Sequence, residues 1–170
     1  MKLASLEAIV HALNEAGTRY LVAGGLAVNA HGYERLTHDI DLVVQLNRHN
    51  VLKAFDALQG LGYKPRVPVT AKQFADSSQR DEWIATKGMK VLNLYSDQHP
   101  TAPVDLFVTE PFDFDREYDA AMRGEIAPGI VALFVTIPTL IAMKDTTGRA
   151  RDADDVEHLR WLIEETKRSD

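Results

Sequence analysis

The stretch HDIDLVV, His38–Val44, decides how this chain folds. Its two aspartates, Asp39 and Asp41, stand two positions apart in a run that otherwise turns apolar. Successive side chains of a strand point to opposite faces, so both carboxylates leave one face and the apolar side chain between them leaves the other. The pattern predicts a strand over 39–44 with two neighbouring carboxylates on one face.

An earlier stretch, YLVAGG over 20–25, predicts a short strand that ends in a tight turn. Residues 26–31 then run without a helix breaker until Gly32, which predicts a helix after the turn. Glycines let the backbone approach an anion closely, and the N-terminus of a helix offers free N–H groups. Gly24 and Gly25 therefore fit a phosphate site, although a tight turn alone explains them equally well.

A third aspartate, Asp105, stands inside the apolar run 104–108, where a charge is costly unless it is paired or binds a ligand. Mg²⁺ prefers oxygen ligands and commonly binds one or two protein carboxylates together with substrate phosphates. A third carboxylate at the same site completes a two-metal clamp for phosphoryl displacement. The structural alternatives are that Asp39 opens the strand at a turn, that Asp41 faces solvent from an edge, and that Asp105 is a strand-edge residue.

The remaining pattern predicts one α/β or α+β domain over 1–170, a mixed sheet with helices packed on it. Helices are predicted at 3–13, 26–31, 51–58, 114–122 and 138–144 and from 152 onward, and strands at 20–23, 39–44, 104–108 and 130–136. A hairpin is predicted from 82–85 and 90–95 around the turn Lys87-Gly88, and a broken edge strand with a loop over 63–78. The C-terminal helices, 138–168, are expected to pack on the core.

The composition excludes several classes of function. The 170 residues include 0 cysteines, which rules out disulfide frameworks, thiolate zinc sites and cysteine nucleophiles, and favours a reducing cytoplasm. A net charge of −6 argues against a duplex-binding surface covering the whole protein. Charged residues interrupt the apolar pattern of the first 17 residues, so neither a signal peptide nor a membrane span is expected. We predict a cytoplasmic protein that does not bind membranes.

In combination these motifs resemble the nucleotidyltransferase superfamily with the DNA polymerase β-like fold. The resemblance is carried by 21–25, 35–42 and 104–106, and by a looser tail motif in 140–144, Gly148-Arg149 and Asp152. Within the superfamily the chain is most similar to the small bacterial minimal nucleotidyltransferases and the AbiEii-like toxin nucleotidyltransferases. The likeness extends from Tyr20 to about Leu162.

The resemblance implies a nucleotidyltransferase-like mixed sheet and an Mg²⁺- or Mn²⁺-dependent enzyme. Such an enzyme transfers a nucleoside monophosphate from an NTP, such as ATP, to an acceptor hydroxyl and releases pyrophosphate. By the same resemblance Asp39, Asp41 and Asp105 are catalytic and bind the metal, with Asp105 as the base that activates the acceptor. The residues implied in nucleotide binding are Gly24, Gly25, Arg35, Thr37 and Lys144.

Several of these residues also have structural explanations. Arg35 and Thr37 either reach a phosphate or the acceptor, or Thr37 satisfies backbone groups in the turn. Lys144 either lies near the nucleotide phosphates or is a solvated surface lysine. Asp152 suits the N-cap of the last helix. Tyr33 either stacks on a base or covers the turn.

The acceptor is left open between a protein side chain, an RNA 3′ end such as that of tRNA, and a small molecule such as an aminoglycoside-like antibiotic. A role in a toxin–antitoxin pair, with a cognate antitoxin protein as partner, is compatible with the resemblance. The alternative is a catalytically silent nucleotide- or partner-binding module of the same fold, against which the three intact aspartates argue. A metal-dependent phosphodiesterase is the third hypothesis, but it does not need a triphosphate cradle such as Gly24-Gly25.

Overall fold

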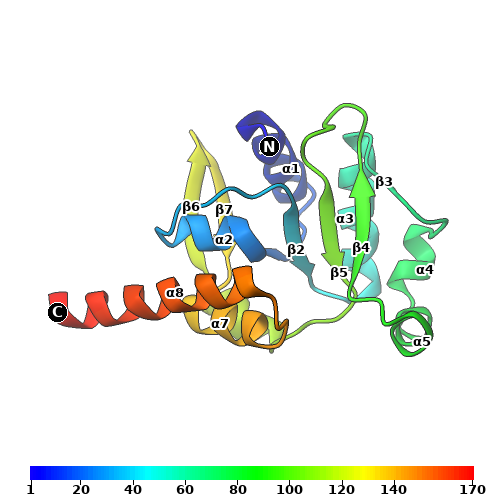
Figure 1. Cartoon of the computed structure of the whole chain (residues 1–170). Helices are drawn as coiled ribbons and strands as arrows, with labels where there is room; N and C mark the ends of the chain where they lie inside the picture. Colours follow the sequence, from blue (N-terminus) through cyan, green and yellow to red (C-terminus); the bar gives the residue numbers. More distant parts are fainter.

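The computed structural model describes residues 1–170 and folds them around one seven-stranded mixed sheet in the order β3-β4-β5-β2-β1-β7-β6 (Figure 1). The strands are β1 (Tyr20–Val22), β2 (Ile40–Val44), β3 (Lys64–Pro65), β4 (Val91–Tyr95), β5 (Val104–Phe107), β6 (Met122–Ala127) and β7 (Ile130–Phe134). The helices are α1 (Leu3–Glu15), α2 (Gly24–Ala30), α3 (Arg48–Gly60), α4 (Ala71–Ala75), α5 (Ser77–Lys87), α6 (Phe114–Ala120), α7 (Ile137–Asp145) and α8 (Ala150–Ser169). The chain is thus a single α/β domain with a mixed sheet, as predicted.

The pairing of the central strands brings the three chemically important stretches together. Strand β2 pairs with β1 in the antiparallel sense and with β5 in the parallel sense, and β4 pairs antiparallel with β5. The register sets Asp41 beside Asp105 and Asp105 beside Asn93. Residues that lie directly opposite in a ladder project to the same face. One face of the sheet therefore carries a polar row across β2, β5 and β4.

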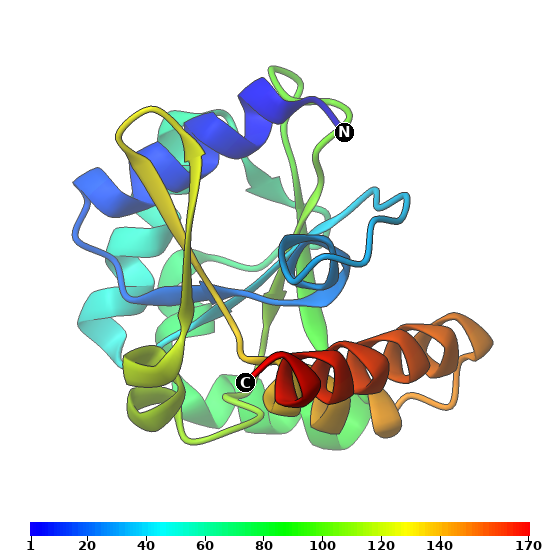
Figure 2. The same cartoon turned by 90° about the vertical axis from the view of Figure 1, so that its left-hand side faces the viewer.

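The helices divide unequally between the two faces of the sheet (Figures 1 and 2). Helices α1 and α3 lie on one face, and α2 lies on the other, next to β2. Burial follows this arrangement, because alternate residues of β4 and β5, such as Leu92 and Leu106, are buried toward α1 and α3. The residues between them are half-buried on the opposite face. The face that carries the polar row is the less covered one.

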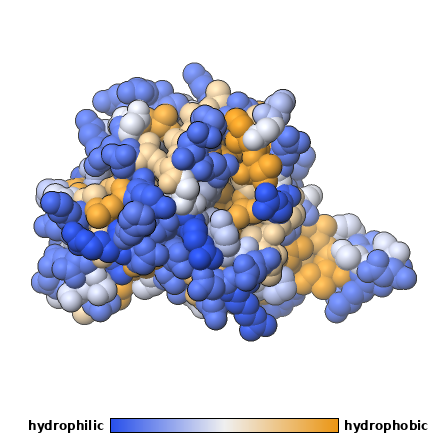
Figure 3. Space-filling view, turned by 180° about the vertical axis from the view of Figure 1, so that it is seen from behind, coloured by the Kyte–Doolittle hydropathy of each residue, from blue (hydrophilic) through white to orange (hydrophobic).

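The two C-terminal helices form a separate layer at one end of the sheet. Helix α7 packs on α8, and α8 continues beyond the body of the protein (Figure 1). Seen from behind, hydrophobic residues gather where α8 leaves the body (Figure 3), and a hollow there is lined by Met122, Ile137, Pro138 and Ile163 among others. No helix in this chain combines the length and the apolar character that crossing a bilayer requires.

The predicted hairpin over 82–95 is wrong in its first half. Residues 77–87 form helix α5, which Asp76 caps by accepting a hydrogen bond from the backbone N–H of Ser78. Gly88 has φ +59° and ends the helix as its C-cap. Glycine in this left-handed conformation serves a helix end as well as a hairpin turn, so the local pattern at Lys87-Gly88 supports both structures.

Two further elements were not predicted. The segment 63–78 contains the expected short edge strand, β3, but also helix α4, which begins with a capping box between Thr70 and Gln73. Strand β6 pairs with β7 although its sequence, MRGEIA, contains few residues that favour strands. Its Gly124 faces the ring of Phe134, where a Cβ atom would lie 2.9 Å from the ring.

Candidate active site

The glycine turn between β1 and α2 is packed directly against a carboxylate. Gly24 has φ +60°, and a Cβ atom there would lie 1.9 Å from Oδ2 of Asp41. A Cβ atom on Gly25 would lie 2.6 Å from Oγ1 of Thr37 and 3.1 Å from Nη2 of Arg35. Only glycine permits both this backbone conformation and these approaches. The turn therefore brings bare backbone next to Asp41, Thr37 and Arg35.

Asp41 and Asp105 lie beside each other on the paired strands β2 and β5. Burial raises the pKa of Asp41 to about 6, and the negative charges of Asp105 and Asp39 add to the rise. Burial also raises the pKa of Asp105, against which a hydrogen bond from Nδ2 of Asn93 to its Oδ1 (2.6 Å) acts. Two carboxylates that repel each other at a partly desolvated position are stabilised when a cation binds between them.

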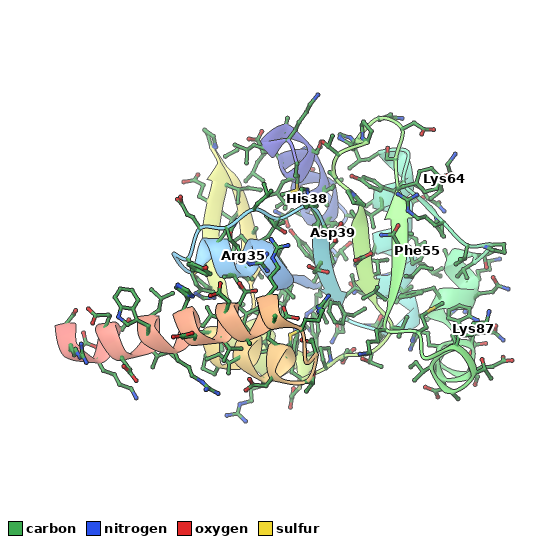
Figure 4. All side chains as sticks on the ribbon, in the orientation of Figure 1. Arg35, His38, Asp39, Phe55, Lys64 and Lys87 are labelled. Atoms are coloured by element: carbon green, nitrogen blue, oxygen red, sulfur yellow. The ribbon has the colours of Figure 1, made fainter.

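Asp39 takes a different position from the other two aspartates. It precedes the first residue of β2, its side chain is exposed, and Figure 4 shows it over the middle of the sheet. It is near enough to raise the pKa of Asp41 and of Asp105. No group of three or more His, Asp or Glu side chains in the chain is close enough together to hold a metal ion by itself. The structure thus brings Asp41 and Asp105 together and leaves Asp39 at their margin.

Lys144 is buried, so the alternative of a solvated surface lysine is wrong. Its Nζ lies 3.0 Å from Oδ1 of Asp152 and 2.8 Å from Oδ2 of Asp155. The positive charges of Lys144 and Arg149 partly offset the rise in the pKa of Asp41. Lys144 therefore acts on the carboxylate site through space while two aspartates of α8 hold it in place.

Asp152 is not the N-cap of α8, because that position belongs to Arg149. The buried carboxylate of Asp152 accepts hydrogen bonds from Lys144, from Oγ1 of Thr147 (2.6 Å) and from Nε of Arg149 (2.7 Å). Burial alone would raise the pKa of Asp152, but these hydrogen bonds outweigh it and lower the pKa to about 2. Asp152 remains ionised because three donors surround it.

Arg35 reaches the same ion cluster from the other side. Its Nε lies 2.7 Å from Oδ1 of Asp155, and its Nη2 donates a hydrogen bond to Oδ2 at 2.8 Å. Asp155 is fully buried, so it lies between Arg35 and Lys144 without contact with solvent. Figure 4 shows Arg35 between α2 and α8, next to the glycine turn. Both predicted cations are thus attached to α8 through one aspartate.

The other predicted residues of this region have mainly structural contacts. Oγ1 of Thr37 lies 3.5 Å from the carbonyl oxygen of Asp39, which is a weak hydrogen bond. Tyr33 stacks on His158 with ring centroids 3.7 Å apart and donates a hydrogen bond from its hydroxyl to Oδ2 of Asp154 (2.8 Å). Tyr33 therefore attaches the 31–39 segment to α8 and is not free to stack on a base.

Sequence reasoning missed Asp155 and Asn93 as site residues. Asp152, Asp155, Val156 and Leu159 follow the i, i+3, i+4, i+7 spacing of a buried helix stripe, so two carboxylates on that stripe were a detectable signal. Asn93 stands in an apolar run and carries no local signal. Only the antiparallel register of β4 and β5 brings it to Asp105.

Comparison with known proteins identifies the fold. No family model and no curated protein matches the chain. A candidate nucleotidyltransferase from Thermotoga maritima, TM1012, is 15% identical, with a TM-score of 0.55 over 95% of this chain and 92% of its own. The antibiotic-resistance factor ANT(2'')-Ia is 12% identical, with a TM-score of 0.55 over 98% of this chain and 93% of its own.

A third similar structure is the lincosamide antibiotic adenylyltransferase LnuA, solved with lincomycin bound. It is 13% identical, with a TM-score of 0.52 over 88% of this chain and 90% of its own. At these identities the similarity concerns the fold alone and does not bear on the narrower resemblance to AbiEii-like toxins. The agreement covers nearly the whole chain. The chain therefore has the fold of the nucleotidyltransferases.

Proposed function

We propose that this protein is a metal-dependent nucleotidyltransferase that transfers a nucleoside monophosphate from an NTP to an acceptor hydroxyl. One observation carries the proposal. Two partly desolvated carboxylates, Asp41 and Asp105, lie side by side next to the glycine turn at Gly24, and the cations Arg35 and Lys144 lie beyond it. Carboxylates on one side and positive charge on the other suit a triphosphate that arrives with its metal.

The residues present fit a divalent metal. Asp41 and Asp105 offer oxygen donors; burial raises the pKa of Asp41, and repulsion from Asp105 and Asp39 adds to the rise. Asp39 lies at the margin of this pair and would have to move closer to become a ligand. Mg²⁺ or Mn²⁺ held there would supply positive charge that stabilises the phosphates and lowers the pKa of an acceptor hydroxyl. In this proposal all three aspartates are metal ligands.

The triphosphate is proposed to lie along the glycine turn. Gly24 and Gly25 carry no side chain that would block it, and Thr37, whose hydroxyl lies next to Gly25 and makes only a weak hydrogen bond to the carbonyl oxygen of Asp39, is proposed to donate to a phosphate. Arg35 and Lys144 contribute positive charge from behind the turn. Because Asp155 already binds both cations, we expect them to act on the phosphates mainly through their field.

Asp105 is proposed to act as the base. Burial raises its pKa, which favours proton uptake, and Asn93 occupies only Oδ1, so Oδ2 is available. The acceptor hydroxyl passes its proton to Asp105 as its oxygen forms a bond to the α-phosphorus. The bond from the α-phosphorus to the bridging oxygen breaks, and pyrophosphate leaves with that electron pair.

The test is the transfer of label from each of the four α-labelled NTPs, with Mg²⁺, to material of a bacterial lysate. We expect Asp105→Asn and Asp41→Asn each to lower transfer by about 10³-fold or more, which is about 4 kcal/mol of transition-state stabilisation. Asp56→Asn is the matched control, because Asp56 is exposed on α3, on the opposite face of the sheet. Equal activity of Asp105→Asn and Asp56→Asn would contradict the assigned role.

The alternative is a nucleotide-binding module without turnover, favoured by the observation that Arg35 and Lys144 are already paired with Asp155 and Asp152. It predicts Mg²⁺-dependent NTP binding without label transfer or pyrophosphate release.

Hydrolysis of a phosphodiester without NTP would favour the phosphodiesterase. A toxin role remains a proposal from the resemblance. Growth arrest on induction of the wild type, absent for Asp41→Asn and relieved by a coexpressed antitoxin, would support it.

A further inference from the structure

The face of the sheet beside the carboxylates is open and faces away from α1 and α3. On β4 the side chains of Val91, Asn93 and Tyr95 are half-buried and alternate with buried ones. In Figure 1, β4 and β5 face the viewer with no helix in front of them, whereas α2 lies on the other side of β2. An acceptor bound at Asp105 has this surface next to it, across β4 toward the edge strand β3.

The polar row continues past Asn93 to two cations. Strand β3 pairs with β4 so that Lys64 lies opposite Tyr95, and Arg66 follows in the same register with its backbone N–H bonded to the carbonyl of Asn93 (3.0 Å). Nε of Arg66 donates a hydrogen bond to Oδ1 of Asn93. The order across the sheet is thus Asp105, Asn93, Arg66.

Both cations lie against the ring of Tyr95 on this face of the sheet. The guanidinium carbon of Arg66 lies 4.9 Å from the centroid of the Tyr95 ring, and Nζ of Lys64 lies 5.1 Å from it. The acidic group nearest to Lys64 is Asp97, at 4.0 Å with its side chain 87% exposed. Arg66 is bonded to an amide instead of a carboxylate. No carboxylate lies closer than 4.0 Å to either cation, while the charge of Arg66 partly offsets the rise in the pKa of Asp105 through space.

We infer that Lys64, Arg66 and Tyr95 form the acceptor subsite and that the acceptor carries an anionic group, a phosphate or a carboxylate. This inference rests on the proposed function. The backbones of β5 and β3 lie about 10 Å apart, but the side chain of Arg66 reaches back to Asn93, whose amide contacts Asp105, so one amide group separates the cation from the carboxylate. The acceptor lies across this row, with its hydroxyl at Asp105 and its anionic group at the two cations.

Charge decides between the candidate acceptors. An amine-rich small molecule meets two like charges at Lys64 and Arg66, whereas an anion gains charge-assisted hydrogen bonds from both. An RNA 3′ end and a small phosphorylated compound share the required chemistry, so the experiment separates these two sources.

The experiment gives the enzyme, with Mg²⁺ and α-labelled NTPs, three acceptor probes from a bacterial lysate. They are its small-RNA fraction, and its small-molecule extract divided by anion exchange into an anionic pool and a neutral-plus-cationic pool. The test variant is Lys64→Gln/Arg66→Gln. The matched control is Lys87→Gln, whose exposed side chain lies on α5, away from this face (Figure 4).

We expect label in the RNA or the anionic pool, and ribonuclease treatment of the product identifies which. The double variant raises the KM for that acceptor about tenfold or more, with the KM for NTP unchanged, and the effect shrinks at high salt. The conservative variant Lys64→Arg, with Arg66 unchanged, keeps both positive charges and is expected to bind the acceptor more tightly than the double variant does. The unchanged KM for NTP excludes misfolding as the cause.

Two results overturn the inference while leaving the transferase intact. One is label confined to the neutral-plus-cationic pool. The other is a double variant as active as Lys87→Gln at every acceptor concentration. If the wild type labels no lysate material at all, the three probes and the protein fraction included, although it binds Mg²⁺ and NTP, the proposed function fails, and the acceptor subsite fails with it.

Discussion

Two pairs of aspartates flank the glycine turn, and they differ in the charges around them. Asp152 and Asp155 on α8 are buried but contact Lys144, Arg149 and Arg35 at 2.7–3.0 Å. Asp41 and Asp105 have no cation in contact. The pKa of Asp152 is accordingly lowered to about 2, whereas burial raises the pKa of Asp41 to about 6.

The difference separates a structural role from a binding role. A buried carboxylate with its cations in place is already satisfied, and it holds those cations where they are. A buried carboxylate that repels its neighbour destabilises the free protein, and binding of a positively charged ligand removes that repulsion. We therefore expect opposite effects on stability when the two pairs are substituted.

The largest effect is expected at Asp155. Asp155→Ala leaves the half-buried Arg35 without a carboxylate partner and the buried Lys144 with Asp152 alone, which costs about 3–5 kcal/mol in the free energy of unfolding. Urea denaturation measures this loss, with Asp56→Ala on the exposed surface of α3 as the control. A loss below about 1 kcal/mol would mean that the two cations do not depend on Asp155.

The next effect is expected at Gly24. Gly24→Ala forces a left-handed residue to carry a Cβ atom 1.9 Å from Asp41, and we expect a loss of about 2–3 kcal/mol together with loss of metal and NTP binding. Gly88→Ala is a matched control, because Gly88 has φ +59° and a Cβ atom there meets nothing within 4 Å. It carries only the backbone cost, about 1 kcal/mol. Equal losses of stability in the two variants would show that the side chain of Asp41 moves away from the added Cβ atom without an energetic cost.

The smallest effect is expected at Asp41, where substitution should increase the stability of the protein. Because the folded pKa of Asp41 is about 6, above its ordinary value of 3.8, its contribution to stability is full below pH 3.8 and is lost as pH rises through 6. Metal-free Asp41→Asn is therefore expected to be about 2 kcal/mol more stable than the wild type at pH 7.5, with no difference near pH 4. Thermal unfolding in a chelator across this range measures it, and a destabilised variant at pH 7.5 would contradict the pKa.

Asp152 provides the internal reference for this pH profile. Its folded pKa of about 2 lies below 3.8, so its contribution is full above pH 3.8 and is lost as pH falls through 2. The two aspartates therefore act in separate windows, between about pH 4 and 6 for Asp41 and between about pH 2 and 4 for Asp152. The substitution of Asp41 is expected to change only the upper window.

The sequence was sufficient for features that a short stretch encodes by itself. Alternation at 39–44, the glycines at 24 and 25 and the apolar run around Asp105 predicted β2, the turn and β5, and with them the approach of Asp105 to Asp41. Asp39, predicted beside Asp41 within the strand, instead precedes it. Local patterns failed where one residue serves two structures, as at Gly88, or where pairing in a hairpin overrides propensity, as in β6, which pairs with the next strand β7. They also could not reveal Asn93, Arg66 or the role of Asp155, since their partners are distant in sequence.

The most direct test of the account is whether Asp41 and Asp105 bind a cation together with a nucleotide. Thermal unfolding with Mn²⁺ or Mg²⁺ and a non-hydrolysable NTP analogue measures it. We predict that metal and analogue together stabilise the wild type by about 2.7 kcal/mol at a hundred times the Kd, and that neither Asp41→Asn nor Asp105→Asn shows this gain. The same metal-dependent stabilisation in all three proteins would contradict the central claim.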